Sequence, residues 1–219
     1  MSRLSQSLLN FIFPTANACH LCQRALEGTE NCLCSRCISA LLECRLPEES
    51  RESLVLSQWL ALSAFHHREQ ARELVHLLKY QGDFEAARLL GEAMALVLIQ
   101  SGLHVEVLLP VPMHPVRLRQ RGYNQAEQLA RQVSHHTGIP LFTNGLYREG
   151  SLQTQVHRTR AERLTALTDV FWADETVVQG RRVLLIDDVL TTGATAGACA
   201  KALTDAGAGR ITVLTACRA

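Results

Sequence analysis

Two adjacent carboxylates follow a short apolar run in RRVLLIDDVLTTGATAGACAKALTDAG, residues 181–207. The run before Asp187 and Asp188 is typical of a buried strand, and the alanine-rich segment after the Thr-Thr-Gly turn is typical of a helix. Ligands of open parallel sheets bind outside the carboxyl ends of the strands. We therefore expect the two aspartates to lie at the mouth of a ligand site.

The turn after the aspartates has the composition of an anion site. It leads into a helix N-terminus, where free backbone N–H groups and the positive end of the helix dipole favour a phosphate group. Glycine lets the backbone approach the anion, and threonine hydroxyls add donors, so the predicted loop is Thr191, Thr192, Gly193, Ala194 and Thr195. The two carboxylates can accept hydrogen bonds from vicinal hydroxyls, and the phosphate loop lies beside them. A site of this kind suits ribose 5-phosphate. The alternative is an acidic pair that only caps the next helix.

The cysteines suggest a metal site. Six of the eight lie between positions 19 and 44, and four of these form two pairs with two intervening residues, namely Cys19, Cys22, Cys34 and Cys37. This spacing resembles a zinc knuckle, in which four thiolates hold a structural Zn²⁺ tetrahedrally. Without a convincing export signal, a metal site is favoured over disulfides. Either Cys32 or Cys44 can replace one of the four ligands, and the sequence leaves that choice open.

Charge and hydropathy narrow the class of protein. The 22 Lys and Arg nearly balance the 21 Asp and Glu, so overall charge does not indicate a nucleic-acid or membrane partner. The longest apolar run, MALVLI, is far short of the roughly 20 residues of a membrane span. The N-terminal LLNFIF mimics a secretory signal but is short and is interrupted by Asn10, so we expect it to dock on the core of a soluble, cytoplasmic protein.

Strands alternate with helices along the chain. Apolar periodicity predicts helices over 68–82, 84–100, 124–138 and about 194–206, and strands over 105–112, 181–186 and 211–217. This order predicts an α/β fold with a mainly parallel, twisted sheet covered by helices on both faces. We expect a zinc-binding segment over residues 1–45, a polar linker over 46–58 and the main domain over 59–219.

The stretch VLLIDDVLTTGAT, residues 183–195, resembles the ribose-phosphate signature of type I phosphoribosyltransferases. These enzymes use 5-phosphoribosyl-1-diphosphate (PRPP). The resemblance implies that Asp187 and Asp188 hold the ribose hydroxyls and act in catalysis, while residues 191–195 hold the 5-phosphate. Mg²⁺ would bridge diphosphate and ribose oxygens, mainly through the substrate.

A second stretch, PVPMHPVRLRQRGYNQAEQLA, together with the cysteine spacing, resembles ComF-type competence proteins along nearly the whole chain. The resemblance implies a diphosphate site at Val111, Pro112, Met113 and His114, extended by the cationic residues Arg117, Arg119 and Arg121. Arginines complement diphosphate oxygens bidentately. The alternatives are a solvated basic turn and a histidine that only stabilises the loop.

A third stretch, QTQVHRTRAERLTALTDVF, resembles the flexible segment of the same family. Four residues lie at the expected offsets, namely Gln155, Glu162, Arg163 and Phe171. Two positions depart from the pattern, with Leu152 in place of Thr and Ala166 in place of Asn. An amphipathic helix with exposed arginines is the alternative.

Two functions follow from these resemblances. The first is a component of natural transformation that binds PRPP and works with single-stranded DNA and a helicase-like competence partner. The second is an active phosphoribosyltransferase in which a nitrogen acceptor displaces diphosphate from PRPP. Aromatic residues make up only 5% of the chain, so no stacking surface for DNA bases is evident. The sequence leaves turnover open.

Overall fold

The computed structural model describes residues 18–28, 30–47, 59–148 and 171–219. The chain divides into two compact units, Met1–Glu43 and Cys44–Ala219.

Among its described residues, the first unit has little regular structure before helix α2 (Ser35–Glu43). Two isolated antiparallel bridges, Ala18 with Ala25 and Asn31 with Leu33, hold the preceding turns. The carboxylate of Glu30 accepts a hydrogen bond of 2.7 Å from the amide of Ser35, the first residue of α2. An acidic side chain at this end of a helix satisfies a free amide and complements the helix dipole.

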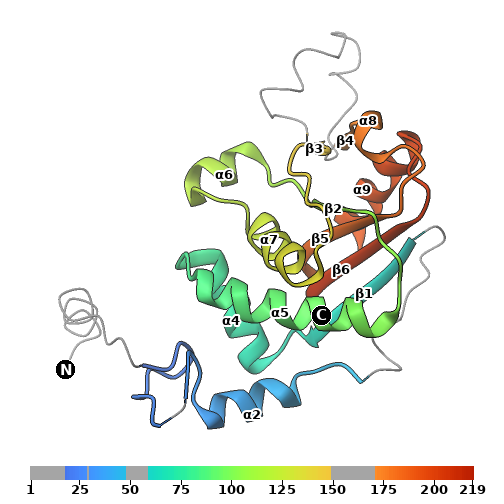
Figure 1. The fold of residues 1–219 in the computed structure, drawn as a ribbon. Coiled ribbons are helices and arrows are strands. Elements are labelled where there is room, and N and C mark those ends of the chain that lie inside the picture. Colours follow the sequence, from blue (N-terminus) through green and yellow to red (C-terminus); the bar gives the residue numbers. More distant parts are fainter. Residues whose placement is uncertain (1–17, 29, 48–58, 149–170) are drawn as a thin grey trace. The chain divides into compact units, whose positions relative to one another are not determined.

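Four parallel strands form the central sheet of the second unit (Figure 1). In order across the sheet they are β1 (Trp59–His66), β6 (Ile211–Arg218), β5 (Val183–Leu190) and β2 (Val107–Pro110). Backbone pairing aligns Val183 with Val107 on one side and with Ile211 on the other. The predicted parallel sheet is confirmed. Its strand β1 was not predicted, because WLALSAFH is apolar without a clear alternation.

Helices cover both faces of this sheet (Figure 1). Three pack on one face, namely α4 (Glu69–Tyr80), α5 (Phe84–Ser101) and α7 (Gln125–Thr137). On the other side lie α9 (Ala194–Asp205), the short helix α8 (Glu175–Val178) and an antiparallel pair formed by β3 (Leu146–Arg148) and β4 (Phe171–Ala173). The remaining helix, α6 (Pro115–Arg121), follows β2 and buries none of its residues.

Side-chain caps and glycines bound two of the predicted helices. The side chain of Asn124 accepts a hydrogen bond from the amide of Ala126 at the start of α7, and the helix ends at Gly138. Helix α5 begins after Asp83, whose carboxylate accepts from the amides of its first turn, and it ends at Gly102. Local capping chemistry therefore fixes the helix limits that the sequence predicts.

Helices α5 and α7 approach each other closely at Gly91. A Cβ added there would lie 2.3 Å from the Cβ of Gln132 on α7, so no rotation of the glutamine side chain relieves the clash. We expect Gly91→Ala to lower the free energy of unfolding by about 1–3 kcal/mol, measured by urea denaturation. Gly197→Ala on α9 is the matched control, because nothing lies within 4 Å of its added Cβ. Equal stability of the two variants would contradict this packing.

Strand β5 extends beyond its predicted end at residue 186. It continues to Leu190, so Asp187 and Asp188 are strand residues near its carboxyl end. Asp187 lies beside Thr215 of β6 in the sheet register. Because successive strand side chains point to opposite faces, the two carboxylates leave the sheet on opposite sides.

The start of the second unit pairs with β1. The amide of His66 donates to the carbonyl of Cys44 (2.8 Å), and the amide of Leu46 donates to the carbonyl of Ala64 (3.1 Å). The rest of the predicted linker, the apolar N-terminal segment and residues 149–170, which include Leu152, Gln155, Glu162, Arg163 and Ala166, lie outside the described residues. Among the described helices, none combines the length and apolarity of a membrane span.

Candidate functional site

A cavity of about 350 Å³ opens at the carboxyl ends of β2 and β5. Residues from three separately predicted segments line it, namely Val111, Pro112, Met113, Arg117, Arg121, Asp187, Asp188, Thr191 and Thr195. The fold thus brings the acidic pair, the threonine turn and the segment after β2 to one place. This is the edge at which parallel sheets bind ligands.

The other predicted residues are placed differently. Three of them line a smaller adjoining cavity of about 50 Å³, namely Thr192, Gly193 and Ala194. His114 lines neither of these two cavities; its Nδ1 accepts a hydrogen bond of 3.2 Å from the amide of Val116 and caps α6. That contact matches the alternative of a loop-stabilising histidine. Arg119 is exposed and also lines neither cavity.

Asp188 is almost fully buried yet lines the larger cavity. It is 5% exposed, and its Oδ1 lies 3.0 Å from Nζ of Lys79 on α4. Its other carboxylate oxygen, Oδ2, is buried and has no hydrogen-bond partner in the described part of the chain. A buried charged oxygen without a partner is costly, so this atom fits a hydroxyl or a metal-bound water of a ligand.

Asp187 has a different electrostatic environment. Its Oδ1 accepts a hydrogen bond of 2.8 Å from the amide of Asp188. Burial, followed by the neighbouring charge of Asp188, raises the pKa of Asp187, and this hydrogen bond and the charges of Lys79 and Arg148 offset the shift only in part. The pair therefore accepts a proton more readily than two separate surface carboxylates.

This raised pKa predicts how stability depends on pH. In the folded chain Asp187 keeps a proton that the unfolded chain loses near pH 3.8, so its contribution to stability is lost as pH rises through the folded pKa. Asp187→Asn removes this loss, because asparagine does not ionise. We expect the melting temperature of this variant to fall several degrees less than that of the wild type between mildly acidic and mildly alkaline pH.

Thermal unfolding across that pH range provides the measurement. The control is Asp205→Asn, which changes an exposed carboxylate paired with Lys201. Parallel melting curves for the wild type and Asp187→Asn at every pH would contradict the raised pKa.

The 191–195 loop leaves donors free at the start of α9. Gly193 has φ 77°, a left-handed conformation that favours glycine, and α9 begins at the next residue. The amide of Ala194 makes a long contact of 3.4 Å with Oγ1 of Thr192. Within the described part of the chain, the amides of Thr195 and Ala196 have no acceptor. These amides and the helix dipole favour an anion here.

Sequence reasoning missed two cations of this site. Lys79 ends the apolar pattern of α4, and no local signal links it to Asp188. Arg148 ends β3, lines the cavity and lies with its guanidinium carbon 5.5 Å from the ring centroid of Phe171. Both reach the site only through tertiary packing.

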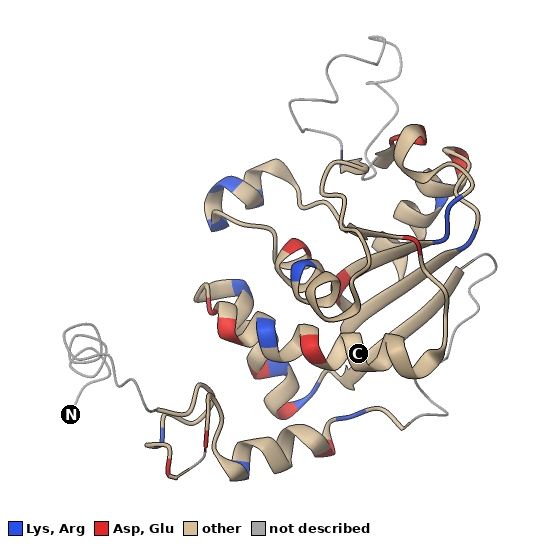
Figure 2. Cartoon of the chain, viewed as in Figure 1, with Lys and Arg blue, Asp and Glu red and all other residues tan. Residues whose placement is uncertain are grey.

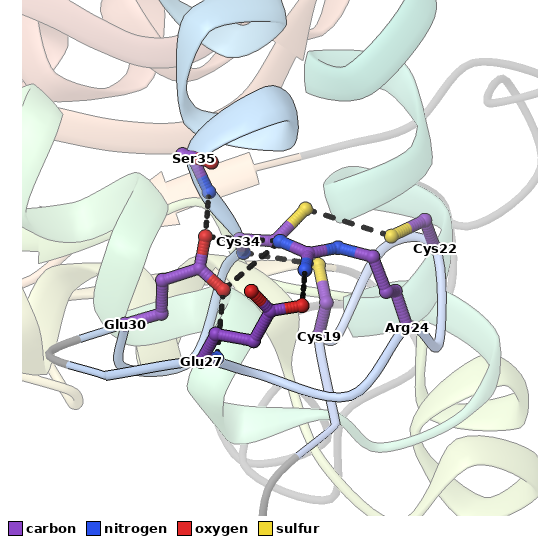
Figure 3. A network of polar contacts seen from close by, with 7 residues as sticks. All are labelled: Cys19, Cys22, Arg24, Glu27, Glu30, Cys34 and Ser35. Carbon is purple, nitrogen blue, oxygen red and sulfur yellow. Dashed lines mark hydrogen bonds and ion pairs between the residues drawn. The ribbon is translucent and has the colours of Figure 1, made fainter.

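Four cysteines of the first unit converge. Figure 3 shows three of them, namely Cys19, Cys22 and Cys34. The Sγ atoms of Cys19, Cys22, Cys34 and Cys37 all lie within 4.8 Å of one another. Thiolates bound tetrahedrally to zinc, with bonds of about 2.3 Å, lie about 3.8 Å apart, so a small adjustment accommodates the ion. The structure thus groups the four paired cysteines, and the two alternative ligands, Cys32 and Cys44, are not part of this group. The thiol of Cys32 contacts Asn31, and that of Cys44 donates to the carbonyl of Arg68 in the second unit.

Polar groups around this cluster favour thiolates. The amide of Cys37, with a smaller contribution from Arg24, lowers the pKa of Cys34 to about 6. The guanidinium of Arg24 is held in turn by the carboxylates of Glu27 and Glu30, each at 2.9 Å (Figure 3). Burial and the neighbouring thiols raise the pKa of Cys37, which is the effect that a bound cation would relieve.

Comparison with known proteins gives consistent matches. A model of the phosphoribosyl transferase domain matches residues 107–219. Competence protein F of Haemophilus influenzae is 32% identical over 155 residues, which cover 68% of this chain and 68% of that protein. The DNA utilization protein YhgH of Salmonella typhimurium is 28% identical over 220 residues, which cover 91% of this chain and 96% of that protein.

Among solved structures, the glutamine PRPP amidotransferase of B. subtilis, complexed with ADP and GMP, is 25% identical with a TM-score of 0.44. The match covers 61% of this chain and 26% of the amidotransferase, so this chain spans about a quarter of that enzyme.

Proposed function

Because this chain belongs to the phosphoribosyl transferase domain family, and within it to the ComF-type competence proteins, we propose that it binds PRPP with Mg²⁺ and serves DNA uptake. Its site is the cavity at the ends of β2 and β5. The protein acts in the cytoplasm, where both PRPP and incoming single-stranded DNA are met.

One observation carries the PRPP proposal. The buried Oδ2 of Asp188 has no partner among the described residues and lines the same cavity as Thr191 and Thr195. A pentose phosphate supplies what each part lacks, because its hydroxyls donate to the carboxylates and its phosphate accepts from the free amides of the 191–195 loop. A lone phosphate or a lone sugar would satisfy only one part.

The diphosphate of PRPP would lie along Val111, Pro112 and Met113. Arg117 and Arg121 line the same cavity and would neutralise its remaining charge. Mg²⁺ prefers oxygen ligands and keeps several waters, so the substrate would mainly hold it, with the carboxylates of Asp187 and Asp188 nearby, and it would neutralise part of the diphosphate charge.

The four clustered cysteines hold a structural Zn²⁺ in this proposal. Cys19, Cys22, Cys34 and Cys37 supply the four thiolates of a closed tetrahedral site. The first unit has one regular helix among its described residues and therefore little core of its own. Metal binding supplies the free energy that such a short segment lacks.

The names of the relatives support the cellular role. The two curated relatives described above are named a competence protein and a DNA utilization protein. Single-stranded DNA and a helicase-like competence partner are the partners that this role implies. The PRPP site would then make DNA handling respond to the supply of nucleotide precursors.

Complementation tests the combined proposal. In Haemophilus influenzae lacking its own competence protein F, this chain should restore transformation, and the double variant Asp187→Asn with Asp188→Asn should not. Asp205→Asn, a change of one exposed carboxylate on α9, should restore it fully. Normal transformation by the double variant, at equal protein level, would show that the PRPP site has no role in DNA uptake.

A diphosphate-release assay separates binding from turnover. An active transferase releases diphosphate from PRPP in the presence of a nitrogen acceptor, because the acceptor forms a bond to C1 as the diphosphate oxygen leaves. A binding protein retains PRPP intact with every acceptor tested. Purified protein with PRPP, Mg²⁺ and ammonia or nucleobases decides between the two.

A further inference from the structure

A third and larger cavity, of about 720 Å³, opens beside the PRPP pocket, between the end of α4 and α6. It has the size of a cofactor or nucleotide site. Its lining includes Lys79, Arg117 and Arg121, and no carboxylate is among the described residues that line it. Figure 2 shows the basic residues gathered on α6. This cavity, named here the α4–α6 cleft, therefore favours an anionic ligand.

The α4–α6 cleft also presents flat surfaces. The side chain of Tyr80 is 69% exposed, and the guanidinium carbon of Arg121 lies 5.4 Å from its ring centroid. Tyr123 adds a second ring, which its hydroxyl fixes by donating to the carbonyl of Leu78. Nucleobases stack on tyrosine rings and on arginine planes. Thus the fold gathers a stacking surface in spite of the low aromatic content of the chain.

Arg117 is available for a phosphate. It lies on α6, is exposed, lines the cleft, and forms no ion pair with any described residue. Guanidinium groups bind phosphate oxygens through two parallel hydrogen bonds. A cation without a partner beside an exposed aromatic ring matches a ligand that has a planar base and a phosphate.

We propose that the α4–α6 cleft binds one nucleotide unit, with its base against Tyr80 and Arg121 and its phosphate on Arg117. The unit is either a free mononucleotide or part of a single strand, because both offer the same base and phosphate. This site adjoins the PRPP pocket and shares Arg117 and Arg121 with it, and its nucleotide ligand goes beyond the function proposed above. The two sites are neighbours, since Lys79, Tyr80, Arg117 and Arg121 line both cavities.

Titration calorimetry of the full chain without PRPP tests this site, with thymidine monophosphate as one probe and a short oligothymidylate as the other. Arg117→Gln and Tyr80→Leu should each weaken binding at least about fivefold, the loss expected for one stacking or phosphate contact. Arg119→Gln is the matched control, because this exposed arginine of the same helix does not line the cleft. It should change thymidine monophosphate binding less than about twofold.

The probes distinguish the two sources of the nucleotide. Tighter binding of the strand, with the same dependence on Tyr80 and Arg117, identifies a strand site, and binding of the mononucleotide alone identifies a free-nucleotide site. If neither probe binds, the proposal is overturned. An equal loss in Arg117→Gln and Arg119→Gln also overturns it, because binding would then follow only the net charge of α6.

The double variant Asp187→Asn with Asp188→Asn separates this proposal from the PRPP proposal. Nucleotide binding should persist in it within about twofold, since neither aspartate lines the α4–α6 cleft. Loss of nucleotide binding would place the nucleotide in the PRPP pocket and overturn this inference. If the wild type binds the nucleotide but not PRPP, the cleft stands and the PRPP site fails.

Discussion

Replacing both aspartates, Asp187→Asn with Asp188→Asn, is expected to lower the affinity for PRPP in the presence of Mg²⁺ by at least about 100-fold. Each hydrogen bond to a charged group contributes about 1.5–3 kcal/mol, and two such bonds to the ribose hydroxyls are lost. The variant also loses the charged carboxylate of Asp188, which would help to hold the metal. Titration calorimetry with PRPP and Mg²⁺ gives the two dissociation constants.

The double variant should remain folded, so its loss of PRPP affinity would report on binding. Asparagine keeps the shape of aspartate, and the change removes repulsion between two neighbouring carboxylates, of which Asp187 has a raised pKa. The variant leaves Lys79 without its ion-pair partner, but this side chain is partly exposed and can reach water. Asp205→Asn should keep the wild-type affinity within about twofold. Tight PRPP binding by a folded double variant would contradict the proposed role of the pair.

Loss of zinc is expected to unfold the first unit. Structural zinc contributes an apparent 10–16 kcal/mol to small cysteine sites of this kind, far more than the described residues of this unit can supply by burial. Cys34→Ser should therefore lower the zinc content from about one ion per chain to near zero, measured by elemental analysis of protein purified without chelator. Limited proteolysis should then cut within residues 18–43, while the second unit stays resistant.

Cys32→Ser is the matched control for this prediction. It removes a thiol from the same segment, but Cys32 lies outside the four-sulfur cluster. We expect it to retain the full zinc content. Equal loss of zinc in Cys32→Ser, or a wild type without zinc, would contradict the assignment of the four ligands.

The sequence predicted those elements of the fold that depend on the periodicity and capping of adjacent residues. The apolar run, acidic pair and threonine turn became strand β5, the 191–195 loop and helix α9, because each depends on periodicity or capping in adjacent residues. The cysteine spacing likewise predicted the cluster, since each pair folds within one tight turn. The 191–195 loop and the grouping of the four cysteines were thus readable from the sequence, and the phosphate and the metal that we assign to them stay predictions.

What the sequence did not predict depends on long-range packing. Lys79 meets Asp188 only because α4 packs over β6 beside β5. The α4–α6 cleft brings together Tyr80 and Arg121, which no spacing rule connects. Composition counts aromatic residues but does not show where they gather, so the low aromatic content gave no sign of the two tyrosine rings at this cleft.

The most direct test of the PRPP site is a crystal structure of the protein with PRPP and Mg²⁺. We predict a ribose hydroxyl within hydrogen-bond distance of Oδ2 of Asp188, and the 5-phosphate on the amides of Thr195 and Ala196. A structure at saturating PRPP in which Oδ2 remains without a partner, or in which the phosphate binds away from the 191–195 loop, would contradict the assignment of this pocket.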